Sequence, residues 1–379
     1  MDTHAATNVH SKLTLAGTPL ALLDRARVYV CGITPYDVTH LGHAATFVWV
    51  DVLGRTLHYL GVEAEVCRNI TDVDDVLDEA AARAGKDYDW FAAVGQFQFE
   101  TDMAKLNVRS PQYEPRAHRY IVHVVRLARH LVDAGAAYVR DGSVYFRGGE
   151  VPDRAGISHE RALRLAAEYG GRTGDQAKDD PLDVAIWQAC GQDRAGWDAP
   201  WGRGRPGWHS ECVAMALSVF GVGVDIHAGG ADLTFPHHAY HAAMAEALTG
   251  VTPYARAWMH VGTVTVDGAK MAKSAGNLVL VSDLLGEHPV ALIRMAILDR
   301  RWSQTWDYSA ALLDAAGIRL EDLYSAAGRT TADTTLGEEQ IRRVLSDDLN
   351  IPAALDVAIE TGGGAARSLM TVLGLVPVS

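Results

Sequence analysis

The amino-acid sequence predicts an α/β protein with a parallel sheet that an insertion splits and a helical C-terminal region follows. Two segments that read as strands, at residues 27–31 and 62–70, flank a segment whose apolar side chains recur at helical spacing from Phe47 to Leu60. A strand, a helix and a strand in this order form a βαβ unit, which favours parallel pairing. A second strand-rich part begins near Gly207.

The first half of the chain contains the elements of this unit in order. Residues 1–23 lack a clear period, so we expect a loose start. After the first strand we expect a loop from Gly32 to Gly42, and then a helix that begins at His43 and stops near Gly61. The second strand follows at 62–70.

The chain after residue 75 is predicted to contain helices, an irregular region and a second group of strands. We expect residues 76–135 to be mostly helical and residues 136–205 to be irregular, with a mobile polar stretch at 170–181. The remaining predicted elements are strands at 224–227 and 258–261, a hairpin-like segment at 262–274 that ends in a Lys-rich loop, and helices at 282–300, 309–326 and much of 336–360.

Composition limits the class of protein. The chain has 379 residues, a formal net charge of −13 and four cysteines. No apolar run approaches the roughly 18 residues of a membrane span, and the N-terminus lacks the basic start of a signal peptide, so we expect a cytoplasmic protein without membrane association. Four cysteines in a chain of this length do not indicate a disulfide framework. The negative charge argues against strong nonspecific nucleic-acid binding.

A His-x-Gly-His motif, from His40 to His43, lies where the first strand gives way to the helix. Phosphates bind at such positions, because the N-terminal amides of a helix are unpaired and its dipole favours negative charge. Gly42 allows the backbone to approach a nucleotide, and the two imidazoles can donate hydrogen bonds to phosphate. Taken alone, the motif is equally consistent with two surface histidines beside a turn.

A second motif, Lys270-Met271-Ala272-Lys273-Ser274, lies far downstream on a loop that is followed by Gly276. Two lysines three residues apart can follow a triphosphate as it becomes pyrophosphate, because a lysine is a point charge on a flexible stem. Alone, the motif is better explained as a solvated basic loop. Its order after the His-x-Gly-His motif favours the nucleotide interpretation.

A third set of residues has the chemistry of a metal site. Cys31 ends the first strand, Cys212 follows a Gly-Trp-His sequence, and His237 and His241 are four residues apart, so they share a helix face. Thiolates and imidazoles together suit Zn²⁺, and a catalytic zinc keeps one position open for substrate. The wide separation in sequence makes this signal weak by itself.

Together these motifs resemble the class I aminoacyl-tRNA synthetases of the cysteinyl type and, within that group, the tRNA-independent mycothiol cysteine ligases. The matching segments follow the family order over residues 27–280. They are 31–43, 69–75, 207–212, 229–238 and 270–274. The resemblance to the ligases is carried by 31–37, 41–46, 202–209 and 276–282.

The resemblance implies a Rossmann-type nucleotide-binding core in two halves. The first half is expected at 24–120, an inserted connective subdomain at 121–205, the second half with the Lys-rich loop at 206–283, and a helical C-terminal domain at 284–379.

The resemblance also implies roles for single residues. One zinc ion, which binds the thiolate of substrate cysteine, would be held by Cys31, Cys212 and His237. The ATP-binding and catalytic residues would be Gly32, Gly42, His40, His43, Lys270 and Lys273. The substrate-binding residues would be Thr34, Thr71, Trp208 and Asp232.

His241 departs from both relatives. The synthetases have a glutamate ligand at this position, and the ligases have no ligand there. As a fourth ligand, His241 would close the open zinc position and weaken direct binding of the substrate thiolate. Alternatively, its side chain points away from the metal. We include His241 among the candidate ligands, and both interpretations stay open.

The C-terminal region separates two functions. A tRNA synthetase needs a basic face that reads the anticodon, but from Ala311 onward the chain has five arginines, no lysine and ten acidic residues. We therefore expect a stand-alone ligase. The resemblance implies that it uses ATP to adenylate cysteine and transfers it to the amine of a small molecule, glucosaminyl-inositol in mycothiol synthesis, with release of AMP and pyrophosphate. Mg²⁺ is expected on the ATP, tRNA is not expected as a partner, and the protein is expected to be a monomer or a homodimer.

Three alternatives stay open. The chain could be a cysteinyl-tRNA synthetase that lacks an anticodon domain, or a paralogue from a natural-product pathway that activates another amino acid or amine. The features that leave the second of these open are His241 and the Ala239-Tyr240 pair before it. A non-catalytic binding module is the third, and the intact His40, His43, Lys270 and Lys273 argue against it.

Overall fold

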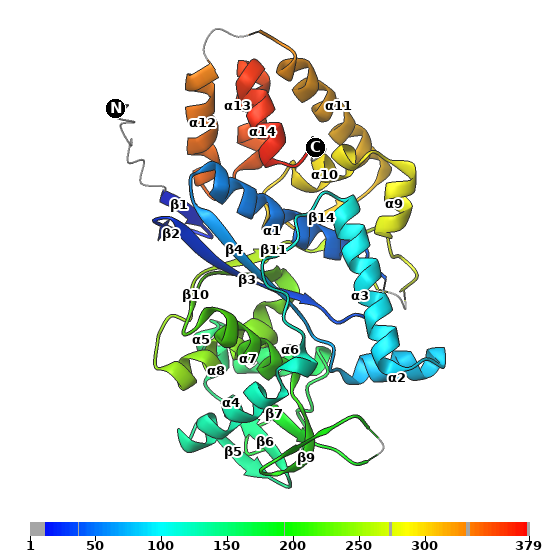
Figure 1. Cartoon of the computed structure of the whole chain (residues 1–379), viewed down its shortest axis with the longest axis vertical. Helices are drawn as coiled ribbons and strands as arrows, with labels where there is room; N and C mark the ends of the chain where they lie inside the picture. Colours follow the sequence, from blue (N-terminus) through cyan, green and yellow to red (C-terminus); the bar gives the residue numbers. More distant parts are fainter. Residues whose placement is uncertain (1–11, 37, 193, 273–274, 331–333, 377–379) are drawn as a thin grey trace, which may run out of the picture.

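The centre of the molecule is a four-stranded parallel sheet. The computed structural model describes residues 12–36, 38–192, 194–272, 275–330 and 334–376. The sheet has the strand order β11-β10-β3-β4, all neighbours being parallel. Its strands are β3 (Arg25–Ile33), β4 (Glu63–Ile70), β10 (Val224–Gly230) and β11 (Ala255–Val261). This confirms the predicted α/β class, and the elements lie as drawn in Figure 1.

Helix α1 (Leu41–Tyr59) connects β3 to β4 and completes the predicted βαβ unit. It begins two residues before the predicted start, because His40 is the N-cap and its Nδ1 accepts a hydrogen bond from the Gly42 amide at 3.1 Å. The helix is buried on most of its surface, since it lies between the sheet and the C-terminal helices.

Alternation along β3 divides the core between the two faces of the sheet. Val28 and Val30 pack into the core that contains α1, whereas Tyr29 and Cys31 belong to the core on the opposite face. Successive side chains of a strand point to opposite faces. This period places Cys31 on the face that is covered by helices α7 (Trp208–Phe220) and α8 (Ala239–Thr249).

The insertion is more regular than we predicted. Residues 136–205 contain a five-stranded sheet of order β5-β6-β7-β9-β8, in which all neighbours are antiparallel. The prediction of irregular structure was wrong because these strands are short and carry little alternation. Their bounds are β5 (Ala137–Arg140), β6 (Ser143–Phe146), β7 (Val184–Ala189), β8 (Trp197–Ala199) and β9 (Gly202–Pro206).

Helices precede this sheet, as the sequence predicted for 76–135, and two further helices, α5 (Val151–Arg154) and α6 (His159–Glu168), interrupt it within the region that was predicted to be irregular. The preceding helices are α2 (Asp75–Ala84), α3 (Tyr88–Lys105), η1 (Ala117–Arg119) and α4 (Ile121–Asp133). The loose start that we expected for 1–23 is also wrong in part. β1 (Lys12–Leu15) and β2 (Thr18–Ala21) form an antiparallel hairpin, and Leu13, Leu15 and Leu20 are buried in the core. Residues 1–11 lie outside the described part of the chain.

The second half of the core leads into the C-terminal helices. After the short turns η2 (Ala231–Leu233) and η3 (Thr234–His238) come α8 and β11, and then the predicted hairpin, formed by β12 (Val264–Val266) and β13 (Ala269–Lys270). β12 also pairs in parallel with β14 (Trp306–Tyr308). The C-terminal helices are α9 (Val281–Glu287), α10 (Val290–Leu298), α11 (Ala310–Ala327), α12 (Thr334–Ser346), α13 (Ile351–Thr361) and α14 (Gly363–Val372).

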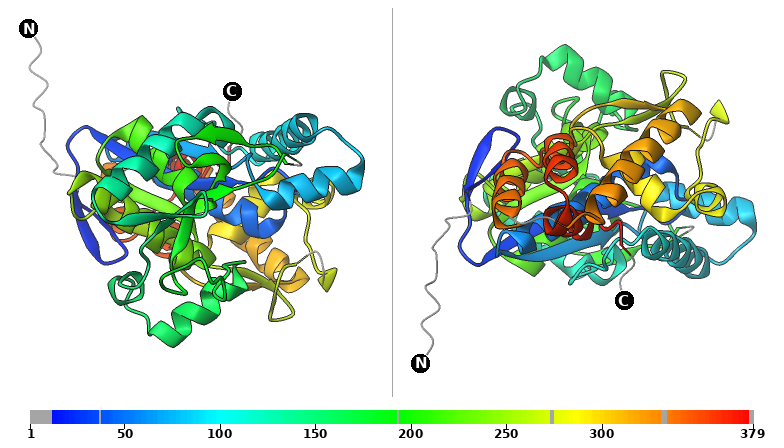
Figure 2. Two further views of the ribbon diagram at one scale, coloured as in Figure 1. Left: turned by 90° about the horizontal axis from the view of Figure 1, so that it is seen from below. Right: turned by 90° about the horizontal axis from the view of Figure 1, so that it is seen from above.

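A buried ion pair joins the helical region to the core. Arg294 of α10 donates to Asp51 of α1 at 2.8 Å, and neither side chain is exposed. Figure 1 shows the C-terminal helices (orange and red) at one end of the long axis and the strands of the insertion at the other, and the two views of Figure 2 look along this axis from either end. Within the described residues, no helix combines the length and the apolarity that a membrane crossing requires.

Candidate active site

A cavity of about 700 Å³ opens at the carboxyl ends of the parallel strands. Ligands of open α/β sheets bind at this edge. The cavity brings together most of the candidate residues that the sequence indicated. They are Cys31, Gly32, Thr34, His40, Gly42, His43, Thr71, Trp208, Cys212, Asp232, His237 and Lys270. His241 does not line this cavity, and Lys273 lies outside the described residues.

The two histidines of the first motif stack on one another at the start of α1. Their ring centroids are 3.8 Å apart with an angle of 26° between the planes. Gly42 lies between them in sequence, and a Cβ at that position would come within 3.0 Å of the His40 ring. The missing side chain therefore leaves the helix N-terminus open to an anionic group.

Gly32 is required by the close approach of β3 and β4. A Cβ there would lie 1.7 Å from the carbonyl oxygen of Asn69, and the Gly32 amide donates to Asn69 Oδ1 at 3.0 Å. Beyond it, the hydroxyls of Thr34 and Thr71 lie 2.8 Å apart, so one donates to the other. These contacts bring the loop that follows β3 and the end of β4 to the same wall of the cavity.

Lys270 and Asp232 face one another across the cavity. Lys270 Nζ lies 2.9 Å from Asp232 Oδ2, with 54% and 36% of the two side chains exposed. Lys270 also lies over the ring of Tyr169, 5.7 Å from its centroid. Burial lowers the pKa of Lys270, but the Asp232 carboxylate outweighs it and raises that pKa, so the ammonium stays charged.

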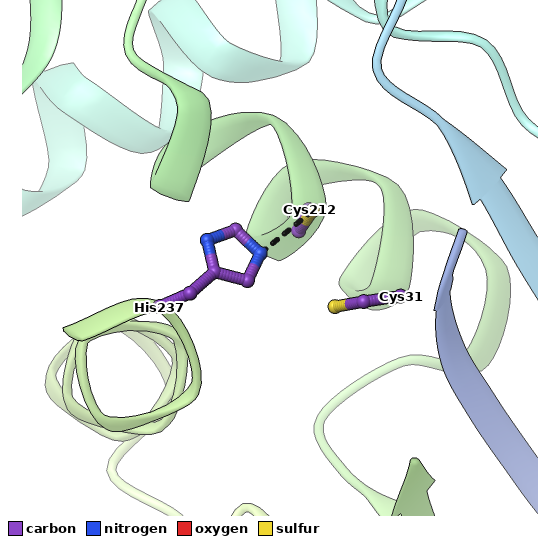
Figure 3. Close-up of side chains that lie close together, drawn as sticks. All are labelled: Cys31, Cys212 and His237. Atoms are coloured by element: carbon purple, nitrogen blue, oxygen red, sulfur yellow. Dashed lines mark hydrogen bonds between the residues drawn. The ribbon is translucent and has the colours of Figure 1, made fainter. Parts of the chain in front are cut away.

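Cys31, Cys212 and His237 converge on one point at the base of the cavity, as Figure 3 shows. Their donor atoms all lie within 4.8 Å of one another, and all three residues are buried. The three side chains come from β3, α7 and the turn before α8. His237 Nε2 is 3.3 Å from Cys212 Sγ. Trp208 stacks on the His237 ring at 4.1 Å and fixes its plane.

This group fits a zinc ion by its chemistry and its spacing. With Zn–S of about 2.3 Å and Zn–N of about 2.0 Å, tetrahedral ligands lie about 3.5 Å apart, close to the 3.3 Å between Cys212 Sγ and His237 Nε2. Burial raises the pKa of the Cys31 thiol and lowers the pKa of the His237 imidazole. A buried thiolate needs a cation, and a neutral imidazole has a lone pair to offer one.

His241 does not join this group. Its ring lies in a second group with Cys31 and His227, whose donor atoms are likewise within 4.8 Å of one another. His241 is fully buried, and burial lowers its pKa to about 3. Among the described residues, neither of its ring nitrogens has a hydrogen-bond partner.

Sequence reasoning missed several residues that orient the site. His209 Nδ1 lies 2.8 Å from His237 Nδ1, and Asn69 Nδ2 donates to Cys212 Sγ at 3.3 Å. His209 directly follows Trp208 in the matched motif, which was a usable signal. Tyr169 of the insertion and His227 of β10 gave no such signal, because only the fold brings them to the cavity and to Cys31.

Comparison with known proteins identifies relatives of this chain. The family described as the class I (C) tRNA synthetase catalytic domain matches residues 21–317. An L-cysteine:1D-myo-inositol 2-amino-2-deoxy-alpha-D-glucopyranoside ligase of Acidothermus cellulolyticus is 42% identical over 338 residues, which cover 87% of this chain and 83% of that protein. The protein of the same name from Streptomyces coelicolor is 43% identical over 359 residues, with coverage of 90% and 86%.

A solved structure shares the fold. Methionyl-tRNA synthetase of Mycobacterium tuberculosis, in complex with methionyl-adenylate, superposes with a TM-score of 0.65 and 17% identity, covering 93% of this chain and 82% of that one. At this identity the likeness concerns the arrangement of the elements only.

Proposed function

Since this chain belongs to the class I (C) tRNA synthetase catalytic-domain family, with cysteine ligases among its relatives, we propose that it is an ATP-dependent cysteine ligase. It adenylates cysteine and transfers the cysteinyl group to the amine of an amino-sugar. The observation that carries the proposal is the single cavity that holds the His-x-Gly-His motif, Lys270 and the thiol–imidazole group together.

In the first step the carboxylate of cysteine attacks the α-phosphate of ATP, and pyrophosphate leaves. His40 and His43 lie at the helix N-terminus, where they donate to the phosphates. Lys270 and Lys273 hold the leaving pyrophosphate, with Mg²⁺ expected on the triphosphate. The carboxylate of Asp232 accepts hydrogen bonds from the α-ammonium group of cysteine. The Thr34–Thr71 pair and Trp208 line the position of the amino acid.

A zinc ion held by Cys31, Cys212 and His237 would supply selectivity for a thiol over a hydroxyl, because soft thiolate is its better ligand. His209 orients His237 through the opposite ring nitrogen, and Asn69 donates to Cys212 Sγ. These two contacts keep the donor atoms aimed at one point, as outer partners of metal ligands do.

In the second step an amine attacks the activated carbonyl, AMP leaves and the amine loses a proton. The amine named in the relatives is that of an inositol-linked 2-amino-2-deoxyglucose, and we propose the same acceptor class here, in mycothiol synthesis. Tyr169 brings the insertion to the cavity beside Lys270, so the insertion contributes to the acceptor's surroundings.

ATP–pyrophosphate exchange with each of the twenty amino acids tests the first step. We expect cysteine to support exchange and serine to fail. Formation of AMP that depends on the amino-sugar tests the second step. Exchange with another amino acid in place of cysteine would favour the natural-product paralogue, and cysteinylation of tRNA would favour the synthetase.

A further inference from the structure

We propose that this chain holds a second position for a divalent zinc-like metal, formed by Cys31, His227 and His241. Cys31 is shared with the group of Cys212 and His237. The proposal does not depend on the proposed ligase activity, because it needs neither ATP nor cysteine.

The spacing of the second group is that of a metal site. Cys31 Sγ and His227 Nε2 are 3.5 Å apart, the separation of about 3.5 Å that a thiolate and an imidazole have on one tetrahedral zinc. His241 completes a set whose donor atoms all lie within 4.8 Å of one another. Cys31 and His227 lie on the neighbouring strands β3 and β10 and point to the same face of the sheet.

Consecutive elements, η3 and α8, supply one imidazole to each group. His237 lies just before α8, and His241 follows four residues later in its first turn. Side chains four apart lie on the same helix face, so both imidazoles point toward β3, where Cys31 stands. The thiol of Cys31 therefore belongs to both groups.

The unpartnered imidazole of His241 points to a missing ligand at the second group. Both of its ring nitrogens are buried without a hydrogen-bond partner among the described residues. A buried polar group that is left unsatisfied destabilises the folded protein. By contrast, Cys212 and His237 of the first group contact Asn69 and His209.

Aromatic side chains fix the two imidazoles. His241 stacks on Tyr254 at 4.9 Å and meets the edge of Tyr29, while His227 stacks on Trp258 at 4.7 Å. This packing holds the rings in place without occupying their nitrogens. His238 Nε2 also lies 3.3 Å from Cys31 Sγ, and its Nδ1 is 2.9 Å from His260, but its donor atoms belong to neither group of three.

The donor set selects the class of metal. One thiolate and two neutral imidazoles suit Zn²⁺ and its spectroscopic substitute Co²⁺, whereas Mg²⁺ and Ca²⁺ prefer oxygen. With both positions filled, the Cys31 thiolate lies between two cations and offsets their repulsion. Protein two-metal sites have separations of about 3.5–4 Å.

Titration of the metal-free full-length chain with Co²⁺ tests the proposal, with native mass spectrometry for the stoichiometry and absorption for thiolate coordination. We expect the unsubstituted chain to bind two equivalents. His241→Phe keeps the aromatic packing and should bind one. Cys212→Ala should also bind one, and Cys31→Ala should lose both. Cys190→Ser removes a thiol that lies outside both groups and should behave like the unsubstituted chain.

Two outcomes would overturn the proposal. If the unsubstituted chain and His241→Phe both bind one equivalent of Co²⁺, His241 is not a metal ligand. One equivalent in the unsubstituted chain and none in His241→Phe makes His241 a fourth ligand of a single zinc. If His241→Phe fails to fold by circular dichroism, His227→Gln serves the same comparison. Pyrophosphate exchange on the same samples tests the ligase activity separately.

Discussion

Lys270 Nζ lies 2.9 Å from Asp232 Oδ2, so a residue of the phosphate-binding loop is bound to a residue proposed to hold the amino acid. In the proposed function the two groups bind different substrates, one anionic and one carrying an ammonium group. On that proposal, the substrate ammonium would replace Lys270 as the partner of the Asp232 carboxylate. The lysine would then be available to the phosphates of ATP.

This exchange of partners predicts that the amino acid strengthens ATP binding. Cysteamine has the thiol and the ammonium group but no carboxylate, so it binds without reacting. We expect it to lower the Kd of ATP by about 1.4- to fivefold, because exposed ion pairs contribute about 0.2–1 kcal/mol. Calorimetry with and without cysteamine measures the change. Ethanethiol, which lacks the ammonium group, is the control, and an equal effect of both compounds would contradict the exchange.

His209 is predicted to support metal binding without being a ligand. Its Nδ1 is 2.8 Å from His237 Nδ1, on the side of the ring opposite to the Nε2 that faces Cys212. His209→Phe should weaken zinc affinity by about 10- to 100-fold, as loss of an outer partner does. Competition with a chromophoric chelator measures it. His123→Phe, at a position outside both metal groups, should leave the affinity unchanged.

The buried ion pair between Asp51 and Arg294 is predicted to be essential for stability. Asp51→Asn leaves the Arg294 guanidinium uncompensated in a site with no exposed side-chain surface. We expect a loss of about 3–5 kcal/mol in the free energy of unfolding, measured by urea denaturation. Glu63→Gln is the control, because it breaks an ion pair with Arg25 in which the arginine side chain is 62% exposed and the glutamate side chain 70% exposed. It should change the free energy of unfolding by less than about 1 kcal/mol.

Asp51 also predicts how stability depends on pH. Although burial raises its pKa, the guanidinium groups of Arg294 and Arg55 outweigh that effect and hold the pKa below its usual value. A carboxyl with a lowered folded-state pKa contributes stability above its unfolded pKa of about 3.9 and loses it as the pH falls further. The unsubstituted chain should therefore lose more stability than Asp51→Asn between about pH 5 and pH 3. Parallel slopes in that window would contradict the assignment.

Much of the core could be predicted from sequence because its signals are local. The two strand-like segments and the helical spacing between them indicated the βαβ unit, and the predicted start of α1 at His43 was within two residues of the observed start. The insertion sheet could not be predicted, since strands of three to six residues carry too little alternation for a period to emerge.

The residues of the candidate site could also be predicted only in part from the sequence. Cys31, Cys212 and His237 could be chosen from motifs, and the structure brings them together. The neighbourhood of His241 could not be predicted, because it depends on the register of β10 against β3, which sets His227 opposite Tyr29. That pairing joins segments about 200 residues apart, and no local pattern encodes it.

The parallel pairing of β12 with β14 has a consequence for dividing this protein into parts. The strand that leads to Lys270 takes its backbone partners from Trp306–Tyr308, which stand immediately before α11. A fragment that ends before Trp306 would expose an unpaired strand edge, the usual template for aggregation. The smallest fragment that keeps the β12–β13 hairpin and its partner strand must therefore extend past Tyr308. The second half of the predicted core, 206–283, therefore cannot be separated from the rest of the chain at its predicted C-terminal boundary.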